Sequence, residues 1–323
     1  MPLYRDIEPY DHGMLDVGDG NRVYWETCGN PRGKPAVVLH GGPGSGSGPY
    51  FRRLFDPDAY RIVVLDQRGA GRSTPPASAY GTDMSVNTMP HLIADLELLR
   101  QHLGIERWLV WGVSFGSVLG LRYAQTHPAA VSELVLTGVA TGSDAEVALL
   151  TRGLGQIFPQ AFERFVGELP ILERAGNLAA AYNRLVESPE PEVRARAARA
   201  WTDWETATIP APPRSVKRFE DPEFRMGFAR TVTHYWGNGH FLGADEAVLR
   251  DAPLLKGIPG TLVQGSLDFG NLAGIVWRLH HAWPGSELVV IDEAGHNAGA
   301  PGVAEAMVAA TDKYARRSES SGS

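Results

Sequence analysis

The 323 residues are 43% hydrophobic and 21% charged, as in a globular protein with room for one large domain or one domain with an insertion. A net charge of -7 argues against nucleic acid or an anionic membrane as the main partner. The N-terminus is acidic, Cys28 is the only cysteine and no long apolar window occurs. We therefore expect no signal peptide, internal disulfide or membrane span, and a cytoplasmic location.

Short apolar runs rich in β-branched residues recur along the chain, and such runs predict strands that are buried on both faces of a sheet. Helical patterns separate several of them, which indicates a mostly parallel, doubly wound α/β sheet with right-handed crossovers. The expected strands are 35–40, 60–66, 107–114, 132–139, 260–266 and 286–292, and the clearest helices are 89–104, 115–127 and 273–284.

The alternation of strands and helices stops between about residues 141 and 245, where the segments look helical and are separated by Pro and Gly. We interpret residues 141–245 as a helical cap inserted into an α/β core domain that consists of residues 1–140 and 246–317. The polar tail 318–323 is expected to be disordered.

Ser114 stands between two glycines in the sequence GVSFG (112–116). It ends the expected strand 107–114 and opens the expected helix 115–127, and this setting predicts a nucleophile elbow. Glycines suit such a tight turn because a Cβ atom would crowd the neighbouring strand and helix. The first N–H groups of the helix would also point beside the serine. The alternative is a glycine-rich turn in which the serine is incidental.

A serine nucleophile needs a histidine base and an acid that orients the histidine. Asp268 follows the expected strand 260–266, and His296 follows the expected strand 286–292. Both therefore belong to loops at the carboxyl ends of late strands, where sites form in open α/β sheets. We expect Asp268 and His296 to complete a triad with Ser114. The competing histidines are His127, His234, His240, His280 and His281, of which His127, His280 and His281 are expected to be structural.

The sequence HGGPG (40–44) directly follows the expected strand 35–40. A tetrahedral intermediate needs two N–H donors about 3 Å from its oxyanion. We expect the N–H groups of Gly42 and Phe115 to supply this oxyanion hole. The ten histidines show no HExxH pairing and a single cysteine forms no cluster, so we expect neither a metal nor a cofactor.

These motifs, in this order, resemble the proline iminopeptidase family of α/β-hydrolases. The similarity covers nearly the whole chain, cap included. It is carried by HGGPG (40–44), DQRGAGRS (66–73), the serine motif, YAQTHP (123–128), IFPQAFE (157–163), AWTDWE (200–205), the HY pair (234–235), HHAWP (280–284) and GHNA (295–298).

The resemblance implies an α/β-hydrolase fold and the triad Ser114, Asp268 and His296, with Gly42 and Phe115 in the oxyanion hole. It also implies a serine hydrolase that cleaves the bond after an N-terminal proline through an acyl-enzyme. In the family, the cap helps to bind the free N-terminus of the substrate.

Departures from the family pattern cluster on the substrate side. Of the two cap glutamates that hold the substrate ammonium in the family, Glu205 matches one and Val232 occupies the place of the other. Phe115 stands where Trp is usual, and Asn271-Leu272 stands where the family often has Cys-Pro. Bulky aromatic residues are also missing after the strand 132–139.

Three tryptophans of the predicted cap are candidates for the substrate pocket. Trp201 and Trp204 have helical spacing, which favours core packing, and Trp236 is a candidate for the pocket wall. We take Glu205 and Trp236 as the substrate-binding candidates.

The favoured interpretation is an aminopeptidase or amidase that acts on a small peptide, amide or ester. The main alternative is an ester, amide or lactone hydrolase of specialised metabolism that recognises no free amine, and the lost acid favours it. The remote alternative is a non-catalytic binding protein with the hydrolase fold. Such proteins commonly lose a triad member, whereas this chain retains all three. The oligomeric state is not predicted.

Overall fold

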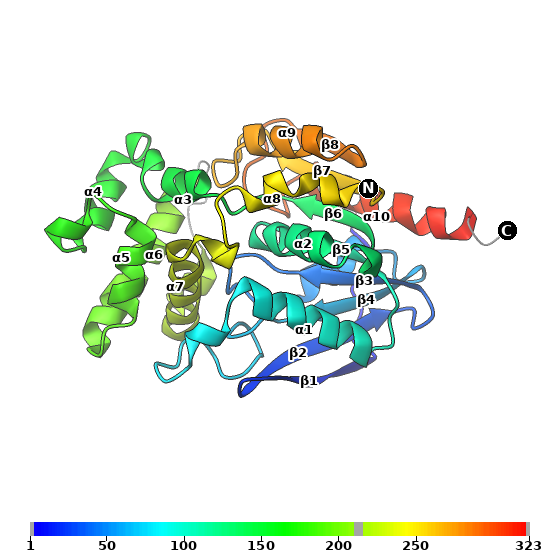
Figure 1. The fold of residues 1–323 in the computed structure, drawn as a ribbon, viewed down its shortest axis with the longest axis horizontal. Helices are drawn as coiled ribbons and strands as arrows, with labels where there is room; N and C mark the ends of the chain where they lie inside the picture. Colours follow the sequence, from blue (N-terminus) through cyan, green and yellow to red (C-terminus); the bar gives the residue numbers. More distant parts are fainter. Residues whose placement is uncertain (1–2, 210–215, 321–323) are drawn as a thin grey trace.

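A computed structural model describes residues 3–209 and 216–320, and its centre is an eight-stranded sheet (Figure 1). The strand order is β1-β2-β4-β3-β5-β6-β7-β8. The first two strands run antiparallel to their neighbours, and β3 to β8 are parallel. The strands are β1 (Asp11–Gly18), β2 (Asn21–Gly29), β3 (Lys34–Leu39), β4 (Tyr60–Leu65), β5 (Trp108–Val113), β6 (Val131–Thr137), β7 (Gly260–Gly265) and β8 (Ser286–Ile291).

All six expected strands are confirmed, with small shifts at their ends, and so is the mostly parallel α/β sheet. The hairpin β1–β2 was not predicted. Strand β1 forms the edge of the sheet and leaves most of its side chains exposed or half-buried, so it lacks the continuous apolar run that marks the parallel strands.

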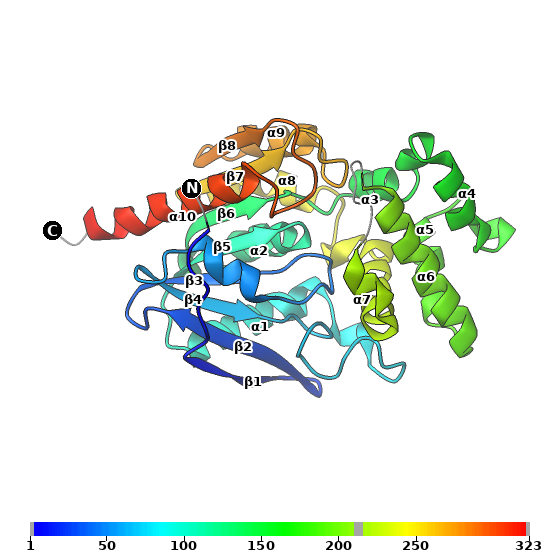
Figure 2. The same cartoon turned by 180° about the vertical axis from the view of Figure 1, so that it is seen from behind.

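Helices cover both faces of the sheet (Figures 1 and 2). On one face lie α1 (Met89–His102), α2 (Phe115–Thr126) and α9 (Ala273–Ala282), which contribute Leu96, Leu119 and Val276 to a single buried cluster. On the other face, Met307 and Val308 of α10 (Val303–Ser320) pack with Val38 and Val64 of the sheet. The apolar strands are therefore buried on both sides, as the runs of β-branched residues predicted.

Between β6 and β7 the chain forms a group of helices that lie to one side of the sheet (Figures 1 and 2). They are α3 (Asp144–Thr151), α4 (Pro159–Gly167), α5 (Leu178–Val186), α6 (Pro191–Ala207) and α7 (Pro222–Gly237), followed by the short α8 (Ala247–Arg250). The division into core and cap at residues 141 and 245 stays a prediction. Helix α10 runs through Ser320, into the tail predicted to be disordered, and residues 321–323 lie outside the described residues.

The helices between β6 and β7 have an aromatic core of their own. Phe165 stacks on Tyr182 at 4.6 Å and on Trp204 at 5.1 Å, measured between ring centroids. Trp201 is fully buried in the same cluster, as is Val232. The helical spacing of Trp201 and Trp204 thus reflects core packing, as the sequence indicated.

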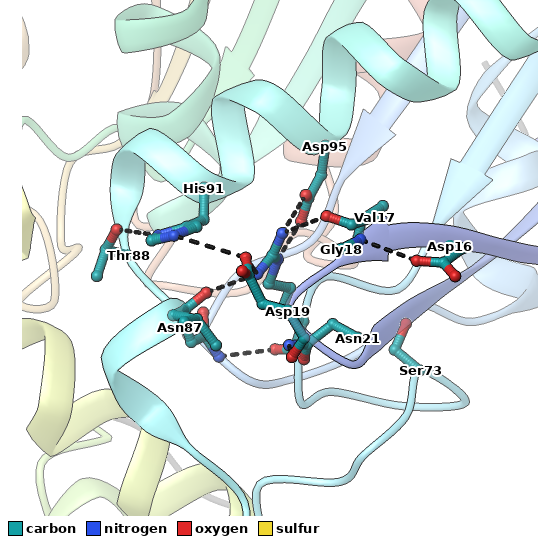
Figure 3. A network of polar contacts seen from close by, with 12 residues as sticks. Asp16, Val17, Gly18, Asp19, Asn21, Ser73, Asn87, Thr88, His91 and Asp95 are labelled. Carbon is teal, nitrogen blue, oxygen red and sulfur yellow. Dashed lines mark hydrogen bonds and ion pairs between the residues drawn. The ribbon is translucent and has the colours of Figure 1, made fainter.

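A polar network joins α7, the β1–β2 hairpin and α1 beneath these helices. Arg68 donates two hydrogen bonds to the Asp95 carboxylate, at 2.7 and 2.8 Å, and a third to the carbonyl of Val17. Figure 3 shows Asp95 of α1 facing the hairpin at Val17, with Asn87 nearby. The side chain of Asn87 donates to the carbonyl of Arg68 at 3.0 Å and accepts from the hydroxyl of Tyr235 in α7 at 2.9 Å.

Among the described residues, no helix has both the length and the apolar character that a bilayer crossing requires.

Helix α2 can lie against β3 only because residue 116 is glycine. A Cβ atom on Gly116 would lie 2.1 Å from the carbonyl oxygen of Leu39, and backbone there cannot move freely. We expect Gly116→Ala to lower the free energy of unfolding by roughly 1–3 kcal/mol, the usual cost of overpacking. The matched control is Gly274→Ala in α9, where a Cβ would meet no atom within 4 Å and Ala would stabilise the helix by up to about 1 kcal/mol. Urea denaturation of the two variants checks this, and equal midpoints would contradict it.

Candidate active site

Ser114 sits in the turn between β5 and α2, with backbone angles φ 55° and ψ −122°. A positive φ is unfavourable for a residue that carries a Cβ, so the turn holds Ser114 in a strained conformation. A Cβ on Gly112 would lie 2.4 Å from the carbonyl oxygen of Gly116, which explains why glycines flank the serine. The strand–turn–helix geometry of a nucleophile elbow is therefore present at this position.

The loop after β3 lies directly beside Ser114, because β3 and β5 are neighbours in the sheet. A Cβ on Gly41 would be only 3.1 Å from the Cβ of Ser114. The buried His40 fixes this loop: its Nε2 accepts the backbone N–H of Gln67 at 3.0 Å, and the Gln67 side chain donates to the His40 carbonyl at 2.9 Å. Burial lowers the pKa of His40, which agrees with a neutral ring that accepts at Nε2.

Asp268 and His296 meet at the carboxyl ends of β7 and β8, where the sequence predicted them. Asp268 Oδ2 and His296 Nδ1 are 2.8 Å apart. The Asp268 carboxylate also accepts the backbone N–H of Asn271 at 2.9 Å and the side-chain amide of Gln264 at 3.1 Å. Only 1% of the Asp268 side chain is exposed, whereas 37% of the His296 side chain is exposed. The acid is thus held rigidly behind an accessible imidazole.

The electrostatics of this pair favour its charged form. Burial disfavours the charged carboxylate of Asp268, but the His296 charge and the hydrogen bonds from His296, Asn271 and Gln264 hold its pKa below the usual value. Burial likewise disfavours the imidazolium of His296. The charge and hydrogen bond of Asp268, with a further contribution from Glu205, outweigh it and raise the pKa of His296.

Ser114 and His296 line the same cavity, which has a volume of about 1010 Å³ and is also lined by Gly42, Phe115 and Glu205. These five predicted residues come from four separate parts of the chain, since Ser114 and Phe115 are adjacent, and the fold brings them to one cavity. In the described part of the chain, Ser114 Oγ has no hydrogen-bond partner. Catalytic hydrogen bonds are often long without substrate and tighten on binding.

A second cavity, of about 770 Å³, shares Ser114, Gly42, Glu205 and His296 with the first. The two cavities differ in their remaining walls. The first continues along apolar side chains, Val118, Val147, Leu150, Leu154 and Trp236. The second continues along the glycine- and serine-rich loop that follows β3. Val216, Phe219, Gly295 and Asn297 also line both cavities, so the two cavities adjoin along a wall that includes Ser114 and His296.

Glu205, near the C-terminal end of α6, lines both cavities. Its Oε1 accepts a hydrogen bond from Trp201 Nε1 at 3.1 Å. Burial raises the pKa of Glu205 to about 7, and the Trp201 bond and the His296 charge offset this only in part. A cation that bound beside this desolvated carboxylate would stabilise its charged form.

The other residues considered for substrate binding differ in whether they line a cavity. Trp236 lines the first cavity beside Trp201, with 5.7 Å between ring centroids. Val232 is fully buried among the aromatic residues of the cap and lines neither cavity in the described structure. Glu146 also lines the first cavity, but its carboxylate accepts hydrogen bonds from Thr141 and Ser143 and caps α3.

His240 lines the first cavity, although its sequence context suggested only a competitor of His296 for the role of base. Its ring stacks on Phe115, with 6.0 Å between ring centroids, and burial lowers its pKa to about 4, so the ring is neutral near pH 7. It sits at a positive φ of 53° in a short turn, and no sequence motif marks such a position. Of the described histidines, the remaining competitors His127, His234, His280 and His281 line neither cavity that contains Ser114.

Comparisons with known proteins agree with this geometry. Residues 34–302 match the family described as alpha/beta hydrolase fold. A probable proline iminopeptidase of Streptomyces coelicolor is 79% identical over 319 residues, which are 98% of each chain. The proline iminopeptidase of Xylella fastidiosa is 44% identical over 315 residues, covering 97% of this chain and 99% of that one.

The fold is also that of a solved structure. The proline iminopeptidase of Mycobacterium smegmatis superposes with a TM-score of 0.62 at 20% sequence identity, covering 97% of this chain and 100% of that one. The level and extent of sequence identity confirm the resemblance seen in the motifs. The chain belongs to the proline iminopeptidase family of α/β hydrolases.

Proposed function

We propose that this protein is a serine aminopeptidase that releases an N-terminal proline from short peptides through an acyl-enzyme. The observation that carries the proposal is the hydrogen-bonded pair of Asp268 and His296, which faces the same cavity as Ser114 at its strained turn. The names of the relatives support the substrate, since those proteins are proline iminopeptidases.

The chemistry follows from the tautomer of His296. Because Nδ1 donates to Asp268, Nε2 carries the lone pair and can accept the proton of the Ser114 hydroxyl as Oγ attacks the scissile carbonyl carbon. The N–H groups of Phe115 and Gly42 stabilise the oxyanion that forms. His296 then protonates the leaving amine, the C–N bond breaks, and water attacks the acyl-enzyme with His296 again as the base.

Glu205 accepts the charged amine of the N-terminal residue in this proposal. A proline at the N-terminus carries a secondary ammonium group, and the cavity offers Glu205 as an acid close to both Ser114 and His296. The apolar wall, including Trp236, contacts the pyrrolidine ring. The relatives, which are named as proline iminopeptidases, do not favour the alternative of an ester or lactone hydrolase that recognises no amine. The cytoplasmic location stays a prediction.

Replacing Ser114 tests the nucleophile. A fluorophosphonate probe is expected to label the wild-type chain once, and Ser114→Ala is expected to abolish labelling. Ser114→Ala should also lower turnover of proline 4-nitroanilide by roughly 10⁴-fold or more, as loss of a serine nucleophile does. The control is Ser85→Ala, which changes an exposed serine on the core. Labelling that persists in Ser114→Ala, measured by intact-protein mass spectrometry, would refute the assignment.

Replacing Glu205 tests amine recognition. Glu205→Gln is expected to reduce kcat/KM for proline 4-nitroanilide by about tenfold to a hundredfold, because a charged hydrogen bond to the ammonium is lost. Hydrolysis of 4-nitrophenyl acetate, which has no amine, should change far less. Steady-state kinetics on the two substrates measure this selectivity, and Asp203→Asn, which changes an exposed acid of the same helix, is the matched control. An equal loss on both substrates would show that Glu205 has another role.

The pH profile of the ester reaction tests the electrostatic coupling of Glu205 and His296. Activity requires neutral His296, so kcat/KM should fall as the pH drops through a pKa raised above 6.5. The Glu205 charge contributes to this raised pKa, so Glu205→Gln lowers the pKa and should move the acidic limb to lower pH. Asp203→Asn should leave the limb in place. An unmoved or upward-moved limb in Glu205→Gln would contradict the coupling.

A further inference from the structure

Arg218 lines the second cavity, which extends beside the loop that follows β3. It belongs to a single-turn helix, Lys217–Glu220, at the entry to α7. Its Nη2 donates to the carbonyl oxygen of Ser45 in that loop, and its guanidinium stacks on the ring of Phe224, 4.0 Å from the ring centroid. The Ser45 carbonyl and the Phe224 ring therefore hold the side chain of Arg218 from two directions, and part of the side chain remains exposed to solvent.

The charge of Arg218 is not neutralised within residues 3–209 and 216–320, where no carboxylate lies within ion-pairing distance of it. Asp66 lies below the loop, but its carboxylate is already bound by Arg72 at 2.7 Å and by Ser47 at 2.5 Å. A guanidinium has five N–H donors, and the Ser45 carbonyl uses one. Burial lowers the pKa of Arg218, as expected for a cation that lacks an anionic partner.

The position of Arg218 suits the far end of a short leaving group. A Cβ on Gly42 would lie 2.8 Å from the backbone nitrogen of Ser45, so the residue that Arg218 holds is packed against the expected oxyanion donor. One extended residue spans about 3.3–3.6 Å. A short leaving group that extends from Ser114 along this loop would follow the wall of the second cavity, which Ser114, Ser45 and Arg218 all line.

We propose that the second cavity receives the leaving peptide and that Arg218 binds its C-terminal carboxylate. The substrate class is then dipeptides and tripeptides that begin with proline and end in a free acid. This inference rests on the proposed function, in which the first cavity receives the N-terminal residue. Arg218 acts as a specificity-determining residue, because it contacts the substrate away from the reacting bond.

The test compares Pro-Gly with its amide, Pro-Gly-NH₂, which removes the carboxylate charge and little else. Wild-type enzyme is expected to prefer the acid by roughly two- to fivefold in kcat/KM, a modest factor because an exposed ion pair contributes little. In Arg218→Gln the preference should disappear through loss of activity on the acid alone. Arg218→Lys, which keeps the charge but not the planar fork of donors, should retain an intermediate preference.

Lys217→Gln is the matched control, because it removes the same charge from the neighbouring residue, which is exposed and lines neither cavity within the described residues. It should leave the preference unchanged. Raising the salt concentration should weaken the wild-type preference, since exposed charges are screened over about 8–10 Å at physiological ionic strength.

The alternative is that Arg218 only ties the cap to the loop through Ser45. In that case Arg218→Gln lowers activity on the acid and the amide by the same factor, and this result would overturn the proposal. An unchanged preference for the acid in Arg218→Gln would overturn it as well. If wild-type enzyme cleaved none of Pro-Gly, Pro-Gly-NH₂ and proline 4-nitroanilide, the proposed function itself would fail. If wild-type enzyme cleaved Pro-Gly and Pro-Gly-NH₂ equally well, the proposed function would stand and only the proposed role of Arg218 would be refuted.

Discussion

The backbone at Ser114 is the constraint on which the rest of the site depends. A residue with a side chain is held at φ 55° between a buried strand and a buried helix, and this projects its hydroxyl from the edge of the sheet. The conformation persists because the surroundings leave no alternative. Gly112 and Gly116 are in backbone contact with each other, and Gly116 packs on the carbonyl of Leu39. A single added methyl group at either glycine would force the strand and the helix apart.

The order of the strands then determines what surrounds the serine. Because β3 lies next to β5, the loop with Gly41 and Gly42 is pressed against Ser114. Because β6, β7 and β8 follow on the other side, the loops that carry Asp268 and His296 end at the same edge. The charges in this space are coupled. Asp268 and Glu205 both raise the pKa of His296, and the charge of His296 in turn lowers the pKa of both carboxyl groups.

The sequence was sufficient for the parts of the molecule that follow strong local patterns. Apolar runs marked the six parallel strands, and the elbow glycines marked Ser114. Edge strand β1 and helix α10 were not predicted from the sequence. The side chains of β1 are mostly exposed and alternate only weakly, and α10 lies beyond the last recognised motif. Position 232 was identified as the place of a missing acid, but a motif does not reveal which side of α7 faces the cavity, and Val232 packs in the aromatic cluster of helices α4 to α7.

Two cavity residues could be found only from the fold. His240 reaches the first cavity through a turn with positive φ, and Arg218 reaches the second because the entry to α7 folds over the loop after β3. Neither residue belongs to a recognisable motif, because their roles depend on packing between segments far apart in the chain. The candidate catalytic residues can be predicted from the sequence because the proposed chemistry restricts their identity, whereas the walls of a substrate cavity can be built from many residue types.

The most direct test of the account is a crystal structure of the enzyme after reaction with a fluorophosphonate. The account predicts phosphorus bound to Ser114 Oγ, with the phosphonyl oxygen about 2.7–3.1 Å from the backbone nitrogens of both Phe115 and Gly42. It also predicts His296 Nε2 within hydrogen-bond distance of Ser114 Oγ, with Nδ1 still bound to Asp268. A phosphonyl oxygen that faces away from both nitrogens, or an imidazole turned away from Oγ, would contradict the account.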